Sequence, residues 1–167
     1  MRLTKKVLNE VISQSAGEDA VKIANYLKGK EDVSELDVAK EMKLSIQEAR
    51  AILYRLYENN FVKFERKRDK HKGWHISHWD FLGENVIKQH HKNHVDRMHD
   101  LRQRIDREQN NTFYMCKFAC SRSTFEIAFD KNFKCPECGA LMQPQDNSRT
   151  IEVLSGKLRE LETKVAG

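Results

Sequence analysis

Four cysteines carry the most specific chemistry in this sequence of 167 residues. Cys116 and Cys120 enclose three residues, and after a gap of fourteen residues Cys135 and Cys138 enclose two. Two short-spaced pairs on separate turns can place four thiolates around one tetrahedral Zn²⁺. Because the protein would supply all four ligands, the spacing predicts one structural zinc ion with no open position for a substrate. Two disulfides or four free thiols are the alternative interpretations.

The residues around the cysteines predict a small zinc ribbon over 112–144. Gly139 follows the last cysteine, where a tight turn favours a backbone with positive φ. The first pair has one residue more than the usual spacing but stays within the range of zinc sites. So small a unit cannot be held together by burial alone, and the metal would supply the missing stability. The apolar surface of the expected β-ribbon comes from Phe113, Tyr114, Phe125, Ile127, Phe129 and Phe133.

Residues 1–81 predict a winged helix-turn-helix domain. Apolar residues recur at helical spacing in successive segments, and Ser34 and Ser45 stand where the last two helices would begin. Glu48, three residues after Ser45, completes a capping box. Alternating residues then indicate two strands joined at Gly73, and helices followed by a hairpin are the order of a winged helix.

The expected hairpin is strongly basic. Between residues 63 and 72, six basic residues stand against two acidic ones, a net charge of +4 where the whole chain has +5. A basic tip beside aromatic side chains suits phosphate contact and stacking on unpaired bases. An ordinary solvated turn would carry the same charges. The candidate nucleic-acid or polymerase contacts of this wing are Lys63, Arg66, Lys67, Arg68, Lys70, Lys72 and Trp74.

The helix expected over 45–60, which would read a major groove, is nearly neutral. Its two arginines, Arg50 and Arg55, are offset by two glutamates. A recognition helix normally presents Arg, Lys, Asn or Gln to bases and phosphates. We therefore do not expect sequence-specific reading of an operator.

Two further amphipathic segments complete an α+β chain. Residues 82–111 lack proline and carry an apolar stripe at heptad spacing, with six basic and five acidic residues around it, which predicts a solvated helical linker. Residues 145–167 show similar spacing, and this helix could pair with the linker, with another chain or with a helical partner subunit. The four expected parts are a winged-helix domain (1–81), a helical linker (82–111), a zinc ribbon (112–144) and a C-terminal amphipathic helix (145–167).

Composition and missing motifs exclude several classes. Hydrophobic residues make up 39% and charged residues 33%, which suits two modest domains better than one compact enzyme. The sequence has no P-loop, GxGxxG, GxSxG or HExxH motif, so we do not expect an enzyme. No apolar run is long enough for a membrane span, and the first twelve residues are too charged for a signal peptide. We expect a cytoplasmic protein, in which cysteines serve as metal ligands.

Two segments resemble a known family. Residues 53–79, with the basic run at 66–69 and the tryptophans Trp74 and Trp79, resemble archaeal transcription factor E. They also resemble the N-terminal half of the alpha subunit of eukaryotic general factor IIE. The ribbon segment at 113–139 resembles the same family, and so does the order of winged helix, helical linker and zinc ribbon.

This resemblance implies a general initiation factor that binds the clamp and stalk of RNA polymerase. Such a factor joins the preinitiation complex after the TATA-binding protein and the factor-B protein, and it stimulates promoter melting. The resemblance places the wing against the clamp and the bubble edge, near the non-template strand of promoter DNA, and the ribbon nearer the stalk. A metal-responsive winged-helix repressor and a pure interaction adaptor are the alternatives.

Overall fold

The computed structural model describes residues 2–68 and 75–166, with side chains up to Lys164. The chain divides into two compact units, residues 1–92 and 93–167. The long helix α5 (Gly83–Asn110) contributes to both units, and the division between them falls inside this helix. Within the described ranges, no helix is both long and apolar enough to cross a membrane.

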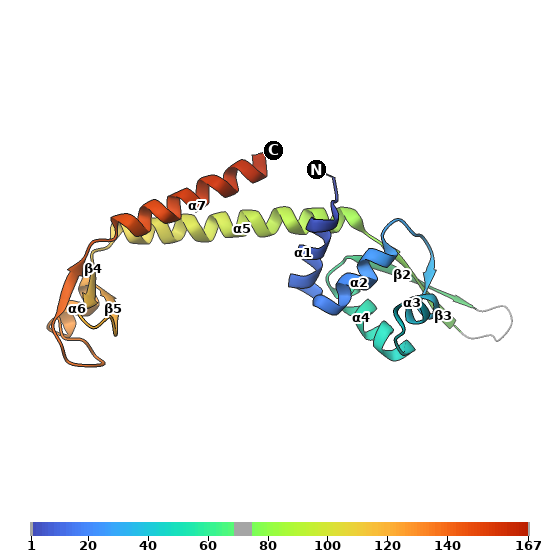
Figure 1. The fold of residues 1–167 in the computed structure, drawn as a ribbon, viewed down its shortest axis with the longest axis horizontal. Coiled ribbons are helices and arrows are strands. Elements are labelled where there is room, and N and C mark those ends of the chain that lie inside the picture. The colour runs from blue at the N-terminus through green and yellow to red at the C-terminus, as the bar shows by residue number, and fades with distance from the viewer. Residues whose placement is uncertain (1, 69–74, 167) are drawn as a thin grey trace. The chain divides into compact units, whose positions relative to one another are not determined.

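The first unit is a winged helix (Figure 1). Its sheet has the strand order β1-β3-β2, and both strand pairs are antiparallel. The two hairpin strands confirm the alternating pattern of the sequence. The elements are α1 (Lys5–Ala16), α2 (Glu18–Leu27), β1 (Val33–Ser34), α3 (Glu35–Met42), α4 (Ile46–Glu58), β2 (Val62–Arg68) and β3 (His75–Phe81).

Side-chain caps fix where α3 and α4 begin. The hydroxyl of Ser34 accepts from the backbone N–H of Asp37 at 3.1 Å. Ser45 and Glu48 form the predicted capping box, in which each side chain accepts a backbone N–H of the other residue. The sequence does not predict β1, because a strand of two residues is too short to show alternation.

Twenty buried residues form the core of this unit. Trp79 on β3 is fully buried and contacts Tyr54 and Phe64, with ring centroids 5.6 Å and 4.8 Å away. Val86, in the first turns of α5, is also fully buried in this core. Asn85 Nδ2 donates to the carbonyl of Asn60 at 2.8 Å. The beginning of the expected linker is therefore packed as part of the winged helix.

The second unit holds a three-stranded sheet and a short helix. Its strand order is β5-β4-β6, with antiparallel pairs. One expectation is wrong here: Phe125, Ile127 and Phe129 lie on a helix rather than on a strand of a β-ribbon, and all three are exposed. The elements are β4 (Phe113–Cys116), β5 (Arg122–Thr124), α6 (Phe125–Asp130), β6 (Met142–Gln145) and α7 (Ser148–Ala166).

Glu108, near the end of α5, connects three parts of the second unit. Its side chain is nearly fully buried and accepts two hydrogen bonds from the Arg122 guanidinium, at 2.9 Å and 2.7 Å. Asn147 Nδ2 donates to the Glu108 carboxylate at 3.0 Å and to its carbonyl at 2.7 Å. The guanidinium of Arg122 also lies 3.7 Å from the centroid of the Phe113 ring. Helix α5, the sheet and the start of α7 are thus joined at one carboxylate.

The helix α7 lies along α5 of the same chain, which is one of the three partners that the sequence leaves open (Figure 1). Met98 on α5 and Leu154 and Leu161 on α7 are buried. Arg102 Nη2 donates to Glu162 Oε1 at 2.7 Å and links the two helices.

Replacing Glu108 by Gln should lower the free energy of unfolding of the second unit by about 2 kcal/mol, because the buried ion pair loses its carboxylate. The loss is smaller than for a fully buried pair, since water still reaches the Arg122 guanidinium. The hydrogen bonds from Arg122 lower the pKa of Glu108. The stabilisation from the Glu108 carboxylate is therefore complete above its pKa in the unfolded chain, about 4.3. It is lost only as the pH falls through the lower pKa of Glu108 in the folded protein. We expect a constant difference between wild type and Glu108→Gln from about pH 7.5 to 5.5.

Hydrogen exchange of the amides in 113–145 measures this difference without relying on tryptophan, since both tryptophans lie outside the second unit. The matched control is Glu152→Gln, an exposed carboxylate on α7 with the same charge change. Equal exchange rates in the two variants would contradict the proposed connection at Glu108.

Candidate metal centre and nucleic-acid interface

The four cysteine sulfurs form one cluster in the second unit. The Sγ atoms of Cys116, Cys120, Cys135 and Cys138 all lie within 4.8 Å of one another. Cys116 Sγ and Cys138 Sγ are 3.4 Å apart, and none of the four cysteines forms a disulfide within the described part of the chain. Tetrahedral Zn–S bonds of ~2.3 Å would place neighbouring sulfurs about 3.8 Å apart. The cluster therefore has the composition and size of a four-thiolate metal site.

Two backbone turns position these sulfurs. In the second turn the N–H of Gly139 donates to the carbonyl of Cys135 at 2.9 Å, and Gly139 has the expected positive φ of 71°. In the first turn the N–H of Ala119 donates to the carbonyl of Cys116 at 2.7 Å, and Ala119 has a φ of 56°. The extra residue of the first pair thus takes a left-handed conformation, and this turn closes without a glycine.

Hydrogen bonds to sulfur act differently on the cysteines of the cluster. The backbone N–H of Phe118 donates to Cys116 Sγ at 3.4 Å. The hydroxyl of Ser121 lies 3.2 Å from Cys135 Sγ and lowers the pKa of Cys135 to about 6. The hydrogen bond with Cys138 raises the pKa of Cys120 to about 12. One thiolate is therefore available near neutral pH, while a metal would displace protons from the more basic thiols. The sequence gives no sign of Ser121, because only the fold brings it to Cys135.

The wing cations divide into two faces of β2. Lys63 and Lys67 lie on one face and form ion pairs with Asp80 and Asp32. The hydrogen bond from Lys67 is the largest cause that lowers the pKa of Asp32, and Asp32 in turn raises the pKa of Lys67. Both lysines are therefore held by their own chain.

Arg66 and Arg68 lie on the other face of β2, which also carries Val62 and Phe64. Val62 is buried, Phe64 is half-buried, and both arginines are exposed, so the strand continues beyond the core. Neither arginine has an ion pair with another residue in the described ranges. The remaining wing candidates, Lys70, Lys72 and Trp74, lie outside the described residues.

The arginines of α4 are committed to internal pairs. Arg50 donates through Nε and Nη2 to the two carboxylate oxygens of Glu35, at 3.0 Å and 2.7 Å. The side chain of Glu35 is only 4% exposed. Arg55 pairs with Asp19. The sequence predicts a neutral recognition helix from its composition, and the structure adds that carboxylates on α2 and α3 neutralise both of its cations.

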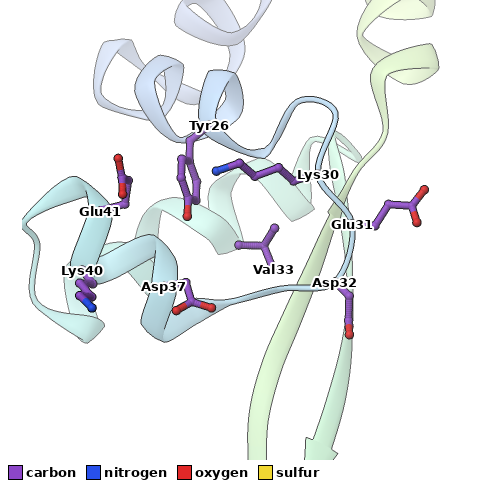
Figure 2. Close-up of a pocket in the computed structure, with 8 residues that line it drawn as sticks. All are labelled: Tyr26, Lys30, Glu31, Asp32, Val33, Asp37, Lys40 and Glu41. Atoms are coloured by element: carbon purple, nitrogen blue, oxygen red, sulfur yellow. The ribbon is translucent and has the colours of Figure 1, made fainter.

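A hollow of about 600 Å³ lies beside α2 and α3 but is unsuited to phosphate (Figure 2). Its lining carries four carboxylates against two ammonium groups, and Lys30 Nζ lies 3.3 Å from the centroid of the Tyr26 ring. Nucleic acid would meet a net negative surface there. The lining residues are Tyr26, Lys30, Glu31, Asp32, Val33, Asp37, Lys40 and Glu41.

A sequence model of the TFIIE alpha subunit matches residues 6–110 of this chain. The chain belongs to this family. Its match covers the winged helix and all of α5, so the resemblance of residues 53–79 is confirmed. The family assignment makes the chain an archaeal-type transcription factor E, a transcription initiation factor and not an enzyme.

Relatives named transcription factor E align over nearly the full length. That of Metallosphaera sedula is 30% identical over 166 residues, which cover 96% of this chain and 92% of the relative. That of Methanococcus maripaludis is 28% identical over 162 residues, covering 96% and 93%. That of Pyrococcus abyssi is 28% identical over 166 residues, covering 99% and 87%. The family works with DNA and the transcription machinery, and its assignment as an initiation factor removes the repressor interpretation.

A solved structure titled as a possible transcriptional regulator from Methanosarcina mazei superposes on 57% of this chain and 85% of its own. The TM-score is 0.46 at 13% identity. That partial likeness adds nothing to the family assignment.

The pair formed by Arg50 and Glu35 should behave as a unit in this transcription factor E. We expect Arg50→Met to lower the free energy of unfolding of the winged helix by about 2 kcal/mol, because it leaves a buried carboxylate without its cation. The double variant Glu35→Met and Arg50→Met should recover most of this loss. Urea unfolding followed by the fluorescence of buried Trp79 measures both effects. Additive losses in the double variant would show that the two side chains act independently.

Proposed function

We propose that the chain binds RNA polymerase in the preinitiation complex and stimulates promoter opening by holding melted DNA through its wing. The observation that carries the proposal is the separation of charge within the winged helix. Arg66 and Arg68 are exposed cations without an ion pair among the described residues, whereas both arginines of α4 are internally paired. That separation supports contact through the wing without sequence reading.

The mechanism needs no chemistry, only stronger binding to open than to closed promoter DNA. Stacking of an unpaired base on an aromatic side chain contributes ~1–3 kcal/mol, and cation–phosphate contacts add a salt-dependent contribution. Since ~1.4 kcal/mol is a tenfold change in an equilibrium, one such contact would already shift the promoter towards the open state. Trp74 is the aromatic candidate, and Lys70 and Lys72 are further candidate phosphate contacts. The expected strand is the non-template strand near the upstream edge of the bubble.

The proposed protein partners are the clamp and stalk of RNA polymerase, with the TATA-binding protein and the factor-B protein in the same complex. The wing would lie against the clamp and the ribbon nearer the stalk. Exposed apolar side chains on α6 support protein contact by the ribbon, because Phe125, Ile127 and Phe129 are 43%, 49% and 60% exposed.

We also propose that Cys116, Cys120, Cys135 and Cys138 hold one structural Zn²⁺. Thiolate ligands in a closed four-sulfur site favour zinc, and the described sulfurs already lie within 4.8 Å of one another. The ion would stabilise the ribbon, and the four cysteines would orient it without leaving an open ligand position.

Charge reversal at the wing should reduce promoter opening. We expect the double variants Arg66→Glu with Arg68→Glu, and Lys70→Glu with Lys72→Glu, each to lower stimulation at least about tenfold, because attraction to phosphates becomes repulsion. Permanganate reactivity of unpaired thymines measures opening, with archaeal polymerase and its two basal factors at a temperature where opening is incomplete. The control Lys5→Glu with Lys6→Glu reverses two exposed charges on α1 of the same unit. Full opening with both wing variants would exclude the wing mechanism.

Removing the metal should unfold the ribbon and leave the winged helix intact. Chelation, or Cys135→Ser, should increase hydrogen exchange across 113–145 to near the unfolded rate, because this sheet has few other buried residues. Exchange in 33–68 should stay unchanged, since the winged helix has its own core. One zinc ion per chain by elemental analysis is the matching expectation. A protected ribbon in the metal-free protein would disprove the structural role of the ion.

A further inference from the structure

A row of four aromatic rings runs from the core of the winged helix to its surface. Trp79 is fully buried, and the ring centroid of Phe64 lies 4.8 Å from that of Trp79. Tyr54 on α4 contacts both rings, with centroid distances of 5.6 Å to Trp79 and 5.9 Å to Phe64. Tyr57, one turn further along α4, contacts Phe64 with centroids 5.1 Å apart and ring planes at 69°. Tyr57 is the exposed end of this row, because 45% of its surface is accessible.

The row supports Tyr57 from two elements. Its ring belongs to α4, whereas the ring that it contacts, Phe64, belongs to β2. Edge-to-face contacts between aromatic rings favour a particular orientation. A side chain that is already oriented loses little conformational freedom when a ligand binds to it. Tyr57 is therefore an exposed aromatic surface with a preformed position.

The exposed arginines of the wing continue the face of the sheet that carries Phe64. Arg66 and Arg68 follow Phe64 at two-residue steps, so all three side chains lie on one face at intervals of roughly 7 Å. The cross-strand neighbours on that face are Ser77, opposite Arg66, and His75, opposite Arg68. Neither neighbour is a carboxylate. The exposed tyrosine and the arginines without ion pairs among the described residues thus lie along the same side of the hairpin.

We propose that Tyr57 stacks on an unpaired base of single-stranded DNA whose phosphates lie against Arg66 and Arg68. An aromatic side chain beside cations that follow the backbone is the arrangement by which proteins hold single strands without reading sequence. The inference rests on the proposed function and deepens it, since it gives α4 a contact with DNA through an uncharged side chain.

Tyr57 would determine the preference for unpaired over paired DNA. The arginines attract phosphates of either form, because phosphate contacts are present in duplex and single strand alike. A base within a duplex is covered on both faces by its neighbours, so it offers no face to a tyrosine ring. Only the open promoter gains the stacking contact, and a contact made in one of two states shifts the equilibrium towards that state.

The test uses the full chain in a complex with archaeal polymerase, its two basal factors and a promoter that contains a pre-melted bubble. A fluorescent analogue of adenine replaces one base of the non-template strand at a time, and stacking on an aromatic ring quenches its emission. Wild type and Tyr57→Phe should quench the same position, because both rings can stack. Tyr57→Leu should abolish that quenching and lower the ratio of affinities for bubble and duplex promoter at least about fivefold.

Three controls separate stacking from a structural role. Leucine keeps an apolar side chain against Phe64, so urea unfolding of Tyr57→Leu should stay close to that of wild type. Tyr57→Leu changes no charge and should keep the salt dependence of affinity, whereas Arg66→Gln with Arg68→Gln should reduce that dependence. The matched variant Phe118→Leu removes an exposed ring from the second unit and should behave as wild type.

Unchanged quenching with Tyr57→Leu would overturn the proposal, and so would the absence of quenching at every position with wild type. Weaker binding of Tyr57→Leu to polymerase without DNA would also overturn it, because the ring would then contact protein. If Tyr57→Leu opens promoters fully while charge reversal at the wing prevents opening, this inference fails and the proposed function stands. If neither change affects opening, both fail.

Discussion

The second unit depends on one constraint, the convergence of four cysteine sulfurs. The buried residues of its ribbon are Phe113, Cys116, Ala128, Cys135 and Met142, so two of the five are candidate metal ligands. The winged helix, by comparison, has twenty buried residues in one core. A left-handed non-glycine residue costs about 1 kcal/mol, and Ala119 adopts that conformation to bring Cys120 to the cluster. Bonds from these cysteines to a metal ion would replace the apolar burial that a unit of this size cannot provide.

Electrostatic pairing then decides which surfaces are free for partners. The arginines of α4 are satisfied by Glu35 and Asp19, and Arg122 is satisfied by Glu108. If one of these arginines bound DNA or protein instead, its carboxylate would lose its cation. For Glu35 and Glu108, which are buried, an unpaired charge would lower the free energy of unfolding. Arg66 and Arg68 in the wing carry no such commitment to described residues. Exposed arginines without an ion pair among the described residues thus lie on the hairpin, whereas both arginines of α4 are paired.

The helix α5 shows why a solvated linker is an incomplete description of residues 82–111. Its first turns bury Val86 in the core of the winged helix, and its last turns bury Glu108 beneath the ribbon sheet. Apolar periodicity cannot reveal the second of these, because a glutamate at position 108 reads as a solvated charge in the sequence. Only the hydrogen bonds from Arg122 and Asn147 make its burial favourable.

The sequence by itself determined the features that are local along the chain. The capping box at Ser45, the alternation of the hairpin, the spacing of the cysteine pairs and the positive φ of Gly139 each involve residues a few positions apart. Tertiary structure alone decided which distant side chains meet. It brought Ser121 to Cys135, Arg50 to Glu35 and Glu108 to Arg122, and it placed Phe125 on a helix. The physical reason is that residues a few positions apart fix the local backbone conformation. Ion pairs and burial between distant residues depend on loop closure and packing, which produce no periodic pattern in the sequence.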